Sequence, residues 1–197
     1  MSERAPVGAP SDDRPADPQT PAHHLVSGTV AIDDLDAFLS RLDGIAAETG
    51  AIVQAFDADL VVSDAHLRAA TRLAARAIAR GEAVARDPGV EVLLYAAGRR
   101  QIDRALNLGV TEGEQRAVVL VADFGGVEGA DRSAADLDAA VSAVEALTTP
   151  TDAEIENGFD ADRVTAFFDV SDRELAATAG GLADVVRERV ALLDVEK

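Results

Sequence analysis

The sequence predicts an α/β domain of mixed (α+β) type, with a central mixed β-sheet of about four strands flanked by helices and followed by a helical C-terminus. Short apolar runs of strand length alternate with segments of helical periodicity through the first two thirds of the chain. The last third shows helical periodicity alone. A length of 197 residues with 48% hydrophobic residues suffices for one domain, which we assign to residues 23–197.

The first 22 residues differ in composition from the rest of the chain. Five prolines are interspersed with Ser, Asp and Gly, so residues 1–22 are predicted to form a disordered leader. His23 and His24 follow it. We interpret them as surface or strand-start residues, because two adjacent imidazoles do not by themselves make a metal site.

The next elements are identified by apolar spacing and capping residues. Residues 24–30 and 51–56 are predicted strands. Between them, Asp33 or Asp34 caps a helix whose apolar face contains Leu35, Phe38, Leu39, Leu42 and Ile45. Ser63 caps a second helix, which runs to about Arg80 and stops at Gly81. Its predicted core face comprises Leu67, Ala70, Leu73, Ala74, Ala77 and Ile78, and its other side carries Arg68, Arg72, Arg76 and Arg80.

Residues 91–110 are the stretch on which the functional prediction depends. The apolar run 92–95 has strand length, Gly98 is predicted to make a tight turn, and a helix is predicted from there to Gly109. Three arginines and a glutamine fall in its first two turns: Arg99, Arg100, Gln101 and Arg104. Free backbone N–H groups and the helix dipole would make this N-terminus an anion receptor, where arginine is unfavourable unless an anion binds.

The remaining elements follow the same rules. Residues 116–124 are predicted to form a strand buried on both faces, broken by two glycines. Helices are predicted at 133–147, where a Thr-Pro pair at 149–150 ends the helix, at 160–168, and at 182–193. Capping boxes at 151–154 and 171–174 predict two further helix starts. The stripe of the last helix is Val185, Val186, Val190 and Leu193.

Charge is distributed unevenly along this acidic chain. The formal net charge is -18, and Lys197 is the only lysine, a composition typical of proteins from salt-in halophiles. Residues 66–104 nevertheless contain eight arginines against four acidic residues, a net charge of +4, so the other residues together carry -22. A basic segment inside so acidic a protein indicates an anionic partner.

Several classes of function find no support in the sequence. The chain has no cysteine, no apolar run long enough to span a membrane and no signal-peptide segment, so we expect a cytoplasmic protein. The kinase-like tripeptide at 123–125 has no strand lysine or catalytic loop beside it, and no phosphate-binding glycine loop occurs. We therefore expect no enzyme activity, no cofactor, no metal and no catalytic residue.

Three segments carry a resemblance to a known family. Residues 55–85 (AFDADLVVSDAHLRAATRLAARAIARGEAVA), 91–110 (EVLLYAAGRRQIDRALNLGV) and 167–197 (FFDVSDRELAATAGGLADVVRERVALLDVEK) are similar to segments of the small tRNA-binding subunit of the KEOPS complex, the PRPK-binding (TPRKB-like) family. The likeness extends from about residue 24 to the end, and residues 91–110 are its most specific part. The leader, the acidity and the near-absence of lysine are departures, and we identify an archaeal, halophilic member.

The resemblance implies a non-catalytic subunit. In that family it docks on the complex's kinase-like ATPase and holds tRNA, including the single-stranded 3′ CCA end. The complex attaches threonylcarbamoyl to the adenosine next to the anticodon, and the active sites lie in other subunits. The implied partners are therefore tRNA, the ATPase and, through it, the catalytic subunit, with no membrane and no DNA.

The residues themselves suggest how RNA would be held. Arg99, Arg100 and Arg104 are predicted to contact phosphates, and Gln101 a base or sugar. His66 and Arg68 would extend the surface, Gly98 would shape the turn, and Tyr95, the only tyrosine, would stack on a base or belong to the core. Gln101 could instead hold the turn. The stripe from Arg68 to Arg80 could instead pair with the protein's own acidic groups or with the partner subunit.

Two other functions remain open at this point. The chain could be a protein-only adaptor that activates the ATPase without touching RNA. It could also be a small α/β enzyme that binds a phosphorylated metabolite at the helix N-terminus predicted after Gly98.

Overall fold

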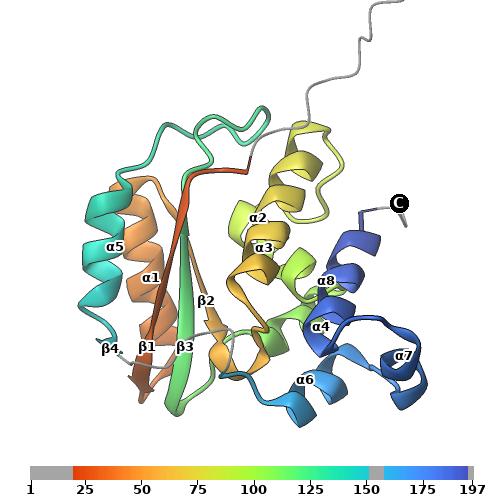
Figure 1. Ribbon diagram of the computed structural model, residues 1–197. Helices are drawn as coiled ribbons and strands as arrows, with labels where there is room; N and C mark the ends of the chain where they lie inside the picture. Colours follow the sequence, from red (N-terminus) through yellow and green to blue (C-terminus); the bar gives the residue numbers. More distant parts are fainter. Residues whose placement is uncertain (1–19, 151–157, 195–197) are drawn as a thin grey trace, which may run out of the picture.

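The computed structural model describes residues 20–150 and 158–194 and arranges them in three layers (Figure 1). The middle layer is a four-stranded sheet of order β2-β3-β1-β4. It consists of β1 (His23–Ile32), β2 (Ile52–Asp57), β3 (Gly113–Ala122) and β4 (Thr149–Pro150). The predicted α/β class with four strands is confirmed. Each strand pair that the structure describes is antiparallel, however, where a mixed sheet was expected.

Helices cover both faces of the sheet (Figure 1). One face carries α1 (Leu35–Thr49) and α5 (Leu137–Glu145), and the other carries the longer helices α2 (Asp64–Ala79), α3 (Pro88–Ala96) and α8 (Leu182–Leu192). The short elements on this second side are η1 (Ala58–Leu60), α4 (Ile102–Ala105), η2 (Leu106–Leu108), α6 (Ala161–Phe168) and α7 (Asp172–Ala177). We call this second side the helical layer.

Strand β3 divides the interior into two cores. Val119 and Val121 belong to the core under α1 and α5, whereas Val118 and Leu120 belong to the core of the helical layer. Successive side chains point to opposite faces of a strand, so residues 117–122 of β3 are buried on both faces, as their continuous apolar sequence predicts.

Capping residues mark the helix ends as expected. The side chain of Asp34 accepts the N–H of Ala37 at the start of α1, and Ser63 caps α2 by accepting the N–H of His66. Gly81 follows α2 with a φ of 68°. The predicted core face of α2 is buried, but Leu39 of α1 is 39% exposed, so the apolar face of α1 is narrower than its sequence suggests. The stripe of α8 is buried, and the capping box at Ser171 is confirmed.

The largest correction concerns residues 92–95, which form part of helix α3 and not a strand. Asp87 caps this helix by accepting the N–H of Val90, and Pro88 occupies its first turn. The helix lies between α2 and β2 and is buried almost all round, which explains why its sequence lacks the polar face of a surface helix.

Other differences are confined to element ends. The helix expected at 133–147 spans only Leu137–Glu145, and the Thr-Pro pair after it forms β4. The leader up to residue 19 and the capping box at 151–154 lie outside the described residues. Among the described residues, no helix combines the length and apolarity needed to cross a membrane.

Candidate functional site

The turn after α3 has the geometry of a helix C-terminus. Gly98 adopts a φ of 58°, its N–H donates to the carbonyl of Tyr95 (2.9 Å), and the N–H of Arg99 donates to the carbonyl of Leu94 (3.0 Å). This pair of bonds is a Schellman motif with glycine at the left-handed position. A Cβ added to Gly98 would also lie 3.5 Å from the Cβ of Arg189 in α8. A side chain at Gly98 is therefore disfavoured by the positive φ and not by lack of space beside α8.

The prediction that Gly98 opens a helix with an anion-binding N-terminus is accordingly wrong. The next helix, α4, begins at Ile102 and has four residues, and Gln101 at its N-cap makes no side-chain capping bond. Arg99 and Arg100 lie just beyond the C-terminus of α3, the negative end of its dipole, where positive charge is favourable, and Arg104 lies in the last turn of α4. No bound anion is needed to explain their position.

Arg99 and Arg100 each donate to the C-terminal end of another helix. The guanidinium of Arg99 donates to the carbonyl of Phe167, in the last turn of α6, and lies 5.2 Å from the centroid of the Phe167 ring. The guanidinium of Arg100 donates to the carbonyl of Leu193, the C-cap of α8, over 2.9 Å. Helix-end carbonyls lack a partner within their own helix, so these two half-buried arginines complete two helix caps.

His66 and Tyr95, two predicted RNA contacts, lie in the core. His66 is 0% exposed, and its Nε2 lies 2.8 Å from the carbonyl oxygen of Ala96. Tyr95 is 2% exposed, and its hydroxyl donates to Asp194 over 3.2 Å. Burial lowers the pKa of His66 to about 4, so the imidazole is neutral at neutral pH. Neither side chain reaches the surface, and both are better understood as parts of the scaffold.

Among the side chains of the predicted RNA site, those of Gln101, Arg104 and Arg68 are exposed, and those of Arg99 and Arg100 are half-buried. The arginines of the stripe on α2 differ in their environments. Arg68 and Arg80 are exposed, whereas the guanidinium of Arg76 pairs with Asp194, whose side chain is only 8% exposed. For Arg76, the alternative of pairing with the protein's own acidic groups is therefore confirmed.

Large apolar side chains also reach solvent in the helical layer. Leu106 is 56% exposed and Ile102 43% exposed beside the arginines, and Val84 and Leu192 are 49% and 46% exposed. On the opposite side of the sheet, Leu39 of α1 is the exposed large apolar side chain among the described residues. Single exposed apolar residues are common, but four in one layer make that layer the better place to seek a protein partner.

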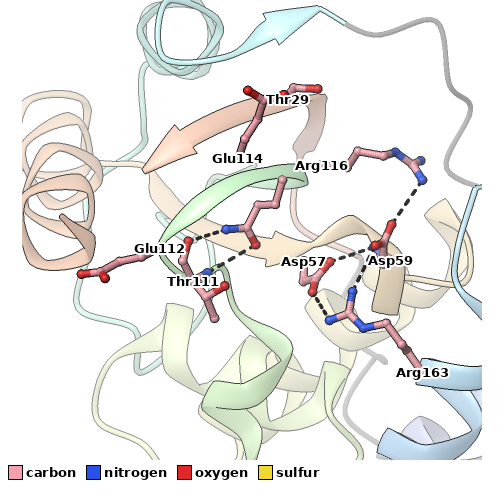
Figure 2. A pocket seen from close by; sticks show the side chains of 9 residues that line it. Thr29, Asp57, Asp59, Thr111, Glu112, Glu114, Arg116 and Arg163 are labelled. Carbon is pink, nitrogen blue, oxygen red and sulfur yellow. Dashed lines mark hydrogen bonds and ion pairs between the residues drawn. The ribbon is translucent and has the colours of Figure 1, made fainter. Parts of the chain in front are cut away.

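A separate polar cavity of about 480 Å³ opens at one end of the sheet (Figure 2). Arg163 of α6 donates to Asp57 (2.6 Å) and Asp59 (3.0 Å), and Arg116 of β3 donates to Asp59 (3.3 Å) and to the carbonyl of Gly158. The hydrogen bond that Arg163 donates to Asp57 raises the pKa of the Arg163 guanidinium above its ordinary value. The charged side chains of this network pair with one another. Because Arg163 of α6 pairs with Asp57 at the end of β2, the network anchors α6 to the sheet.

Sequence reasoning did not identify this cavity, because its charged residues come from three stretches that are distant in the chain: 57–59, 112–116 and Arg163. The remaining lining residues are hydroxyl, amide and acidic side chains: Thr29, Thr111, Glu112, Glu114 and Gln115. No group of three or more His, Cys, Asp or Glu residues in the described ranges is arranged to hold a metal ion.

Comparison with known proteins gives one family. The family model described as kinase binding protein CGI-121 matches residues 36–194, from the first turn of α1 to the end of α8. A search of curated proteins found no match.

Proposed function

We propose that this chain, which belongs to the CGI-121 family of kinase binding proteins, is the adaptor subunit of a KEOPS-type complex, docking on a kinase-like ATPase and holding tRNA for threonylcarbamoylation. The match over residues 36–194 is the observation that carries the proposal, because it includes strands β2 and β3 and the whole helical layer. The catalytic groups would lie in other subunits. A cytoplasmic location and a role in tRNA modification are part of the same proposal.

We assign the kinase contact to the exposed apolar side chains of the helical layer. Buried apolar anchors dominate the binding energy of protein interfaces, and Leu106 and Leu192 are more than 40% exposed in the isolated chain. Exchanging both for aspartate would place two charges in a desolvated contact, whereas neither change removes a buried side chain.

Co-purification tests this assignment. A Leu106→Asp/Leu192→Asp double variant is expected to lose at least about tenfold in the ATPase retained on the tagged chain. Leu39→Asp is the matched control, since it exchanges a similarly exposed leucine on the other side of the sheet. If the double variant captures the ATPase as well as the wild type does, the surface assignment fails. If the wild type captures none, kinase docking itself fails.

For RNA, we propose Arg104, Gln101 and Arg68 as the contacting side chains, with Arg99 and Arg100 contributing the guanidinium N–H groups left over from their helix caps. A guanidinium has five N–H donors, and one bond to a helix carbonyl leaves others for a phosphate. Gly98 contributes through the turn that directs these side chains. His66 and Tyr95 are not among the proposed contacts, because both are buried.

Affinity for tRNA with and without its 3′ CCA end tests this part. Arg104→Glu is expected to weaken binding about tenfold and to leave the melting temperature unchanged, because the side chain is exposed. Arg41→Glu, a change at another exposed arginine, on α1, controls for net charge and should change affinity less than about twofold. Equal binding of intact and trimmed tRNA would rule out recognition of the CCA end.

One observation favours a second candidate, a protein-only adaptor. Arg99 and Arg100 cap α6 and α8, so their presence is explained without RNA. Unchanged tRNA binding in Arg104→Glu together with loss of the ATPase in Leu106→Asp/Leu192→Asp would select this candidate. The metabolite-binding enzyme depended on a helix N-terminus at Gly98, and that residue ends a helix instead.

A further inference from the structure

We propose that His66 is a positioning residue that acts from inside the core, where its imidazole completes the C-terminal cap of α3 and so fixes the direction in which Arg99–Arg104 leave that helix. Its effect on RNA rests on the proposed function. Its effect on the turn does not, so the two can be tested separately.

The contact joins two helices that are distant in the chain. His66 lies in the first turn of α2, where its backbone N–H donates to the hydroxyl of Ser63 over 3.2 Å. Its Nε2 lies 2.8 Å from the carbonyl oxygen of Ala96, the last residue of α3. A carbonyl oxygen can only accept, so the proton of the neutral ring is on Nε2 and is donated to Ala96.

The hydrogen bond from His66 is important for the end of α3, because it satisfies a carbonyl in the last turn of that helix. The last four carbonyls of a helix lack partners within it. In α3, those of Leu93, Leu94 and Tyr95 accept the backbone N–H groups of Ala97, Arg99 and Gly98. The fourth, that of Ala96, accepts the imidazole. The glycine turn therefore supplies three parts of this cap, and a side chain from another helix supplies the fourth.

The ring is held in this orientation by its surroundings. His66 is 0% exposed and meets the edge of the Phe168 ring with centroids 5.9 Å apart and an interplanar angle of 69°. The neighbouring Phe167 contacts Arg99 through its carbonyl and its ring. Nδ1 of His66 is buried without a hydrogen-bond partner in the described part of the chain, so Nε2 is the nitrogen through which this side chain acts.

Two basic segments are thereby fixed relative to each other. Arg68 follows His66 by two residues on α2, and Arg99 follows Ala96 by three residues. The bond from His66 to Ala96 sets the distance between the helix that carries Arg68 and the turn that carries Arg99, Arg100 and Arg104. An extended RNA backbone that contacts both segments would sense any change in that distance without touching His66.

Three substitutions distinguish the loss of the hydrogen-bond donor at His66 from a change in the volume of its side chain. In His66→Gln the side-chain amide places an N–H near the position of Nε2, in His66→Asn the N–H lies near the position of Nδ1, and His66→Leu keeps apolar volume without a donor. Amide hydrogen exchange of Gly98 and Arg99 is measured against Val119 in β3, whose exchange reports general stability. tRNA affinity is measured on the same samples.

We expect exchange at Gly98 and Arg99 to rise at least about tenfold in His66→Leu and His66→Asn relative to Val119, and tRNA affinity to fall about fivefold. His66→Gln should recover most of both. An equal rise at all three amides in every variant would overturn the proposal. If the turn responds as expected and wild-type tRNA binding is absent, the proposed function fails and His66 remains a capping residue.

A measurement on the unsubstituted protein covers the case in which the variants do not fold. Nitrogen chemical shifts of the imidazole at neutral pH are expected to show a protonated Nε2 and an unprotonated Nδ1, with the Nε2 proton protected from exchange. A protonated Nδ1 would overturn the proposal without any substitution.

Discussion

Replacing Asp194 with alanine is expected to lower the free energy of unfolding by about 3 kcal/mol, because it breaks a largely buried ion pair that ties the end of α8 to two other helices. The carboxylate pairs with Arg76 of α2 and accepts the hydroxyl of Tyr95 of α3. The side chains of Asp194 and Arg76 are 8% and 18% exposed, so water replaces the lost carboxylate poorly. Urea denaturation monitored by circular dichroism measures the change.

Arg187→Ala is the control for this prediction. It removes the ion pair with Asp184 on the same helix, in which both side chains are more than 40% exposed, and should cost less than about 0.5 kcal/mol. An Arg76→Met/Asp194→Leu double variant should recover most of the loss, because apolar groups can replace a buried pair. A loss in Asp194→Ala as small as that in Arg187→Ala would mean that the end of α8 is held by other contacts.

Acidification is expected to destabilise the protein through His66. Its pKa is about 4 in the folded state because of burial, against about 6.5 in the unfolded chain. Between these values the unfolded state binds a proton that the folded state does not, so the free energy of unfolding falls as pH decreases. The contribution of His66 is fully present above pH 6.5. It is reduced by about 2 kcal/mol at pH 5 and by about 3 kcal/mol below pH 4.

His66→Gln isolates this effect, because every carboxylate of the acidic surface remains in both proteins. The difference in unfolding free energy between wild type and His66→Gln should narrow or reverse from pH 7 to pH 4.5, at constant salt. A difference independent of pH would show that the imidazole titrates at the same pH in both states.

Elements with capping signals could be located from the sequence. Ser63 predicted the start of α2, Gly81 predicted its end to within one residue, and the capping box at Ser171 correctly marked α7. These signals are local, because a cap satisfies backbone groups within one turn of the residue that provides it. The two-sided burial of β3 was likewise readable, since its apolar run is continuous.

Helix α3 shows where local interpretation failed, although a signal was present. An apolar run of four residues does not distinguish a buried strand from part of a buried helix. Asp87 followed by Pro88 is a helix start, and attention to that pair would have placed the run in a helix. The error affected the prediction of the RNA site, because Gly98, which was expected to start a helix, ends helix α3 instead.

The amino-acid sequence by itself determined the fold class, the two-sided core strand and the basic segment within an acidic chain, because composition, periodicity and capping act over a few neighbouring residues. Only the tertiary structure decided which arginines face solvent. Arg99 and Arg100 meet carbonyls 68 and 93 residues away, and Arg76 meets a carboxylate 118 residues away. Such partners become neighbours when helices pack, and no local pattern records which helix end will lie beside a given side chain.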